Sequence, residues 1–184
     1  MAITKIQSES LNLADTYAFT GTVTGTPSIT MADQWRITSD ISTSTHNADT
    51  LVNSGWERND TNGFSKVGTG MTESSGTFTF PETGIYLITV NYFYKQTSGG
   101  IQYAGVSIQT TTDNSTYNKQ TDDTISTQSS SIPRNCGFGQ FIFDVTNTTT
   151  HKVRFYYFVQ GDSTIMSNTD KNLTYATFTK LADT

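Results

Sequence analysis

The chain has 184 residues, of which 15% are charged and 34% hydrophobic, and its formal net charge is −5. This length suits a single domain with one sizeable core. The eleven Lys and Arg residues are scattered along an acidic chain. Because phosphate binding needs clustered basic side chains, we expect no nucleic-acid partner. No apolar run approaches the roughly 18 residues that cross a bilayer, so we expect no membrane insertion.

Threonine supplies about one residue in five, and Ser, Asn and Gly are also abundant. These residues favour strands and polar turns, whereas good helix formers are scarce and no stretch keeps an apolar 3.6-residue period. We therefore expect an all-β protein. Cys136 is the only cysteine, so the chain can form neither an internal disulfide nor a thiolate zinc site.

Residues 1–30 differ from the rest of the chain. Isolated apolar side chains stand here in a polar sequence that ends at Gly25-Thr26-Pro27. We interpret the segment as a docking arm, with a frayed terminus as the simpler alternative. The side chains expected to dock are Ile3, Ile6, Leu11, Leu13, Tyr17 and Phe19.

Residues 31–184 form the predicted folded domain. Alternating apolar and polar residues, separated by turn-forming clusters, predict a jelly-roll sandwich of about eight antiparallel strands. The clearest strand segments are 35–38, 76–80, 85–94, 103–109, 138–145, 153–159 and 173–181. The polar segment 110–135 is predicted to be a surface loop.

Segment 85–94 is apolar on both faces. One face carries Tyr86, Ile88, Val90, Tyr92 and Tyr94, and the other carries Ile85, Leu87, Thr89, Asn91 and Phe93. Segment 153–159 repeats this pattern, whereas 138–145 is more nearly one-sided and only Ile142 interrupts its polar face. Burying one aromatic side chain is worth about 4 kcal/mol. The second apolar face therefore predicts burial against another subunit, with cover by loops as the alternative.

A longer motif surrounds the start of segment 85–94. Gly76-Thr77-Phe78-Thr79-Phe80-Pro81-Glu82-Thr83-Gly84-Ile85-Tyr86-Leu87-Ile88 resembles the central signature of the C1q and tumour-necrosis-factor (TNF) jelly rolls, Gly-x-Phe-x-x-Pro-x-x-Gly-x-Tyr-x-Phe, with Ile88 in place of the last Phe. Tyr175-Ala176-Thr177-Phe178 stands where that family has Phe-Ser-Gly-Phe. The resemblance covers about residues 35–181, and such motifs specify fold better than function.

Members of that family are usually tight trimers. Their strand after the Gly-x-Tyr motif faces the threefold axis through the residues that lie between its core residues. The resemblance thus implies that Tyr86, Ile88 and Val90 lie in the core. It implies a homotrimer interface formed by Leu87, Thr89, Phe93, Phe138 and Tyr175.

The arm has its own resemblance: residues 3–25 are similar to the N-terminal segment of fibre-like structural proteins of marine bacteriophages. This implies a virion protein, made in the host cytoplasm and anchored by its arm to other capsid or tail proteins. A capsid decoration, a head fibre and a tail-fibre tip all fit, and a host surface glycan or protein is a candidate partner. The alternative is a soluble C1q-like module that recognises glycans or proteins through its loops.

Catalytic patterns are scarce, and we predict no enzyme, no cofactor and no metal. His46 and His151 are far apart and are interpreted as solvated loop residues, and no G-x-S-x-G motif occurs. A third hypothesis, an enzyme that trims surface polysaccharide, would need two convergent carboxylates. Turn chemistry explains the candidate pairs more simply. These pairs are Glu57 with Asp60, Asp122 with Asp123, and Asp162 with Asp170.

Two aromatic segments could stack on sugars: Trp56-Glu57-Arg58 and the region of Tyr103. Aromatic faces suit sugars and protein cores equally well. We predict core packing for both.

Overall fold

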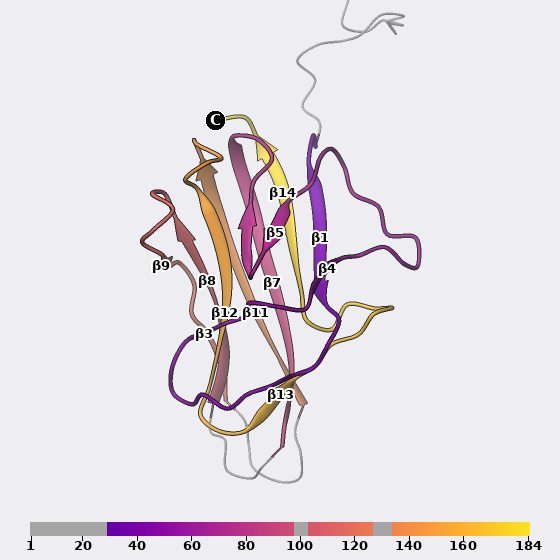
Figure 1. The fold of residues 1–184 in the computed structure, drawn as a ribbon, viewed down its shortest axis with the longest axis vertical. Helices are drawn as coiled ribbons and strands as arrows, with labels where there is room; N and C mark the ends of the chain where they lie inside the picture. Colours follow the sequence, from indigo (N-terminus) through magenta and orange to yellow (C-terminus); the bar gives the residue numbers. More distant parts are fainter. Residues whose placement is uncertain (1–28, 98–102, 127–133) are drawn as a thin grey trace, which may run out of the picture.

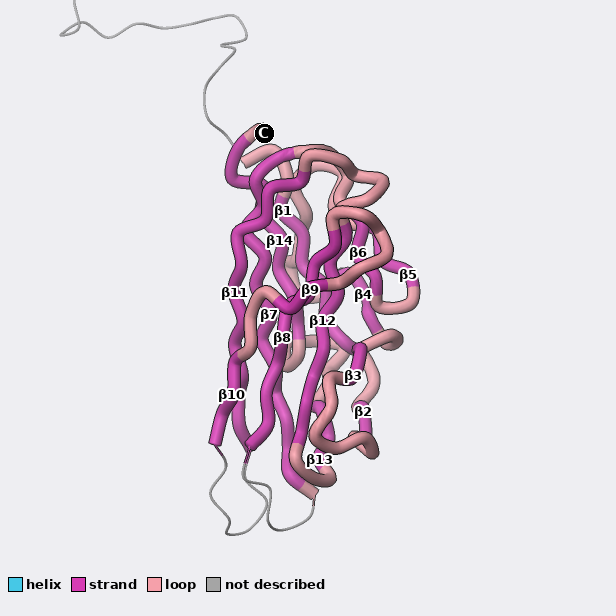
Figure 2. Tube along the Cα trace, turned by 90° about the vertical axis from the view of Figure 1, so that its left-hand side faces the viewer, coloured by secondary structure: helices cyan, strands magenta, loops and turns pink. Residues whose placement is uncertain are grey.

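The computed structural model describes residues 29–97, 103–126 and 134–184. Two antiparallel sheets pack face to face, and the described residues contain fourteen strands and no helix (Figures 1 and 2). The predicted all-β class is confirmed. Six strands are long and eight are short, which is why the sequence predicted only about eight.

The first sheet, here called the β7 sheet, is organised around the longest strand, β7 (Gly84–Gln96). On one side β7 pairs with β11 (Arg134–Val145), and on the other with β14 (Tyr175–Ala182) and β13 (Ser163–Ile165). The sheet continues through β1 (Ala32–Ile37) to β4 (Trp56–Arg58), and β2 (Ile41–Ser42) pairs with β13.

The second sheet, the β8 sheet, contains β8 (Tyr103–Thr111) and β12 (Lys152–Val159) at its centre. β12 also pairs with β6 (Thr77–Thr79), which continues to β5 (Thr72–Ser74), and with β3 (Thr50–Leu51). β8 also pairs with β9 (Asn118–Lys119) and β10 (Asp123–Ser126). The two sheets meet at β10 and β11, where the Phe138 N–H donates to the Asp123 carboxylate at 2.8 Å.

The predicted loop 110–135 is wrong in part, because it contains β9, β10 and the first residues of β11. These strands are polar on their exposed sides, so they lack the apolar alternation that reveals a strand. A tight turn precedes them, in which the Asp113 carboxylate accepts from the amides of Ser115 and Thr116. These backbone donors, with the Thr111 hydroxyl, hold the Asp113 pKa far below its usual value.

The core lies between the sheets. The inward side chains of β7, including Tyr86, Ile88 and Val90, are buried as the resemblance implied. Phe78 lies at the centre of an aromatic cluster, with its ring centroid 5.2–5.6 Å from those of its neighbours. These neighbours are Trp35, Trp56, Phe155 and Phe178. The Trp56 indole also donates to the Val52 carbonyl at 2.9 Å, so its predicted core packing is confirmed.

Two glycines of the signature motif are required by close backbone approach. Gly76 has φ +79°, and a Cβ there would lie 2.5 Å from the Val52 carbonyl oxygen. Gly84 has φ +149°, and its Cβ would lie 2.7 Å from the Ala182 carbonyl oxygen. Any other residue would strain the backbone at both positions. The motif therefore places glycines just before β6 and at the start of β7, where the backbone passes close to neighbouring segments.

Truncating the central ring tests this core. Phe78→Ala should lower the free energy of unfolding by about 3–5 kcal/mol, because a fully buried ring leaves a cavity. Urea unfolding at one fixed protein concentration measures the loss. The control Val67→Ala, at a half-exposed site, should change it by less than about 0.5 kcal/mol. Equal losses in the two variants would contradict the assignment of the core.

Ionisation of Tyr86 should lower the stability of the protein at alkaline pH. Burial, with the nearby Glu82 charge, raises the Tyr86 pKa from 10.0 to about 12. The unfolded chain therefore ionises this phenol first, so stability is full below pH 10 and falls as pH rises towards 12. Thermal midpoints measured across this interval should fall less steeply for Tyr86→Phe than for the wild type. Identical slopes would refute this role of Tyr86.

Candidate functional site

The five residues of the predicted interface lie on one face of the β7 sheet, here called the outer face. Leu87, Thr89 and Phe93 alternate with the core residues of β7. Strand pairing places Phe138 and Tyr175 on either side of Asn91, so both belong to the same face. The structure thus brings these five side chains together, on three adjacent strands.

The outer face is apolar where β7 and β11 meet. Phe138 is 54% exposed, and Ile142, which pairs with Leu87, is 56% exposed. Leu87 and Phe93 are only half-buried, and no other described layer covers the part of this face formed by β7 and β11. The prediction missed Ile142, although its interruption of a polar face was the signal that could have identified it. Exposed apolar side chains on an edge strand such as β11 are typical of an association surface.

The same face becomes polar towards β1, where Arg36 pairs with Tyr175 in the sheet register. The Arg36 side chain is only 2% exposed. Its guanidinium donates to Glu57 Oε1 at 3.3 Å, Asp60 Oδ1 at 3.2 Å and Thr61 Oγ1 at 3.2 Å. The Glu57–Asp60 pair is therefore bound to a buried cation and does not form a free acid pair. Glu57 also lies in β4, contrary to the predicted turn.

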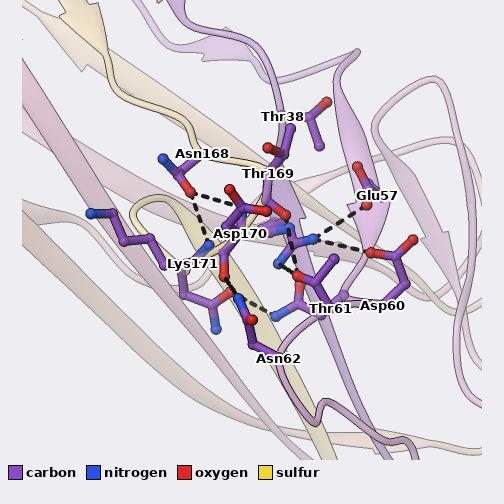
Figure 3. A network of polar contacts seen from close by, with 12 residues as sticks. Thr38, Glu57, Asp60, Thr61, Asn62, Asn168, Thr169, Asp170 and Lys171 are labelled. Carbon is purple, nitrogen blue, oxygen red and sulfur yellow. Dashed lines mark hydrogen bonds and ion pairs between the residues drawn. The ribbon is translucent and has the colours of Figure 1, made fainter.

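Hydrogen bonds from Thr61 and Asn62 join loop 59–64 to loop 168–172 (Figure 3). Thr61 donates to the Thr169 carbonyl at 3.3 Å, and the Asn62 amide donates to the Asp170 carbonyl at 2.6 Å. The two loops border an open polar hollow of about 290 Å³. Among the described residues, two buried polar atoms of its lining, Arg36 Nε and Asn59 Oδ1, have no hydrogen-bond partner.

Only one of the two histidines lies in its predicted setting. His46 lies in a loop and is partly exposed, as predicted, and its Nε2 lies 2.9 Å from Asp162 Oδ1. His151 is instead buried, stacks on Phe143 with ring centroids 5.5 Å apart, and lies near the Thr146 and Thr150 hydroxyls. The prediction of a solvated His151 is wrong, because its ring packs at the edge of the core.

In the part of the chain that the structure describes, no cluster of three or more His, Cys, Asp or Glu side chains could hold a metal ion. No helix there is long and apolar enough to cross a membrane. The six predicted docking residues of the arm all lie outside the described residues.

Known proteins resemble this chain in fold but not in sequence. No family model and no curated protein matches the sequence. Among solved structures, the chain is similar to the TNF protein Eiger of S. frugiperda, with 15% identity over 85% of this chain and 96% of that one, and a TM-score of 0.64. It is also similar to murine APRIL, with 12% identity over 82% of this chain and 98% of that one, and a TM-score of 0.58.

A third structure, PRD1 vertex protein P5, aligns over 84% of this chain and 99% of that one, with 17% identity and a TM-score of 0.48. Identities this low establish a shared fold and leave function open. The chain therefore has a TNF-like jelly-roll fold, and the predicted fold is confirmed.

Removing the Arg36 guanidinium tests the polar end of the outer face. Arg36→Met should lower the free energy of unfolding by about 1.5–3 kcal/mol, since it removes hydrogen bonds to two carboxylates. Amide exchange at residues 59–62 should also accelerate. The control Thr112→Met, at an exposed site in the turn after β8, should leave both quantities unchanged. Unchanged exchange in Arg36→Met would show that Arg36 does not hold the loop.

Proposed function

We propose that this chain is a non-enzymatic structural protein of a bacteriophage particle, and that it assembles as a homotrimer through the outer face of the β7 sheet. The observation that carries the proposal is the uncovered apolar surface on three adjacent strands. Phe138 and Ile142 are more than half exposed there, beside half-buried Leu87, Phe93 and Tyr175. A contact with another copy would remove this surface from water.

The outer face has the composition of a protein interface. Its centre carries aromatic and aliphatic side chains, and one border carries polar side chains such as Gln34 and Thr177. Interfaces between subunits typically combine an apolar centre with a polar rim. The trimeric state is supported by the TNF-like fold and by the sequence resemblance, because members of the C1q and TNF family are usually tight trimers.

The location in a particle is supported by the arm. Residues 3–25 are similar to the N-terminal segments of fibre-like structural proteins of marine bacteriophages. In the proposed role, residues 1–30 attach the trimer to other capsid or tail proteins, and the jelly roll is displayed on the surface. The protein would then be a capsid decoration, a head fibre or a tail-fibre tip, made in the host cytoplasm and carried in the virion.

A soluble C1q-like binding module is the second candidate. The polar hollow between loops 59–64 and 168–172 favours it, because buried polar atoms without partners suit a polar ligand. In that role the outer face would be covered by loops or would bind a different protein. The oligomeric state separates the two candidates.

Charges placed on the outer face test the assembly. The double variant Phe138→Asp, Ile142→Asp should sediment as a monomer, because burying two carboxylates at the contact is unfavourable. The control Val67→Asp changes another half-exposed apolar side chain, outside β7, β11 and β14, and should keep the wild-type sedimentation. Far-UV circular dichroism confirms that both variants fold. A double variant that sediments like the wild type would rule out this face as the contact.

Deleting residues 1–25 tests the arm separately. The shortened protein should keep the wild-type solution mass, because the proposed subunit contact lies on β7, β11 and β14. It should be absent from particles purified from infected cells, as measured by quantitative mass spectrometry. A shortened protein that joins particles at wild-type occupancy would refute anchoring by the arm.

A further inference from the structure

We infer that the outward side of the β8 sheet carries a binding site for one neutral sugar ring. The site is a hollow of about 220 Å³ where β8 begins and β12 ends. It is lined by Asn47, Ala48, Asp49, Tyr103, Lys119, Asp122 and Phe158. Its size lies below the roughly 300–1,000 Å³ of pockets for drug-sized ligands, which suits a single ring.

The floor of the hollow is aromatic. Tyr103 and Phe158 are half-buried, and their ring centroids lie 6.1 Å apart at an angle of 50°. Phe158 pairs with Gly105, where a Cβ would lie 2.5 Å from Phe158 Cε1. The absence of a side chain at Gly105 therefore lets the Phe158 ring lie over the β8 backbone. The predicted core packing of the Tyr103 region is wrong for Tyr103 itself, which faces outward at the edge of this hollow, whereas Ala104 and Val106 are buried in the core.

The border of the hollow is polar and tightly organised. The Lys119 ammonium lies 2.9 Å from Asp49 Oδ2, 3.2 Å from Asp122 Oδ2 and 5.5 Å from the Phe158 ring centroid. The Tyr103 hydroxyl donates to Asn47 Oδ1 at 2.6 Å. These contacts fix donors and acceptors around the aromatic floor before any ligand arrives.

The Lys119, Asp49 and Asp122 side chains remain 34%, 29% and 51% exposed. Their polar groups can therefore reach a bound molecule. This exposure distinguishes the hollow from a sealed ion pair.

This arrangement matches the two-sided chemistry of a pyranose. The C–H face of a sugar ring packs on an aromatic ring, while its hydroxyls both donate and accept hydrogen bonds. Carboxylates accept from hydroxyls, and the ammonium and the Asn47 amide donate to them. An apolar ligand would instead bury the Lys119 ion pairs without new hydrogen bonds, which is costly.

The charges of the hollow select against anionic sugars. Two carboxylates and one ammonium give the lining a net negative charge, on a chain whose own net charge is −5. A sulfated, phosphorylated or uronic sugar would be repelled. Both carboxylates are also engaged by Lys119. We therefore infer binding of a neutral ring and not its cleavage.

The site does not depend on the proposed assembly. It lies on the β8 sheet, whereas the proposed subunit contact lies on the outer face of the β7 sheet. Covering that face leaves the hollow open. A displayed jelly roll could then bind a surface glycan through this sheet.

Neutral methyl glycosides provide the test. Methyl α- and β-glycosides of glucose, galactose, mannose and N-acetylglucosamine are titrated into the full-length protein, and amide chemical shifts are followed by NMR. At least one glycoside should shift the amides of residues 47–49, 103–105 and 158. Tyr103→Ala should weaken its affinity about tenfold, because the stacking surface is lost. The sulfated form of the same glycoside should bind more weakly than the neutral form.

Three controls keep the result interpretable. Tyr103→Phe keeps the ring and should bind within about threefold of the wild type. Tyr175→Ala removes an aromatic side chain from the opposite sheet and should leave sugar affinity unchanged, even if it weakens assembly. Far-UV circular dichroism excludes unfolding. If no glycoside shifts these amides, or if Tyr103→Ala binds as the wild type does, the inference is overturned, and the proposed trimer is unaffected.

Discussion

The alternation of side chains along β7 is the constraint on which the rest of the structure depends. A strand sends successive side chains to opposite faces, so a strand of thirteen residues must place half of them on each side. The inward half, with Tyr86, Ile88 and Val90, packs against the β8 sheet. The outward half, with Leu87 and Phe93, has no described layer above it. The same rule that fills the core therefore creates the apolar outer face.

The two sheets can serve different purposes because each has its own outward surface. The β7 sheet presents apolar side chains to its surroundings, with a polar border held by Arg36. The β8 sheet presents aromatic rings within an organised set of charges around Lys119. A displayed structural protein needs one surface that binds copies of itself and another that stays accessible. In the proposed role, the β7 sheet would supply the first surface and the β8 sheet the second.

Much of the fold could be predicted from the sequence, because local patterns specify it. The motif from Gly76 to Ile88 identified the jelly roll, and the structure explains both of its glycines by close backbone approach. Alternation along β7 separated core residues from outward ones correctly. Strands β9 and β10 could not be predicted in this way, since they are short, mostly polar and lack the apolar alternation that reveals a strand.

The candidate surfaces were predicted less completely. Leu87, Thr89, Phe93, Phe138 and Tyr175 do share one face, but their role in assembly is still a prediction. Ile142 was missed because its strand looked one-sided. The hollow on the β8 sheet joins residues from four distant segments, so no local motif could reveal it. His151 was misjudged because a polar turn in the sequence does not show that Phe143 stacks on its ring.

The solution mass of the unmodified chain tests the central claim most directly. Light scattering on a sizing column should give about three times the chain mass of 20.2 kDa, because the outer face of the β7 sheet is then buried between copies. A mass of one chain at all concentrations would contradict this account. The exposed Phe138 and Ile142 would then need a different partner, and the binding module would become the better explanation.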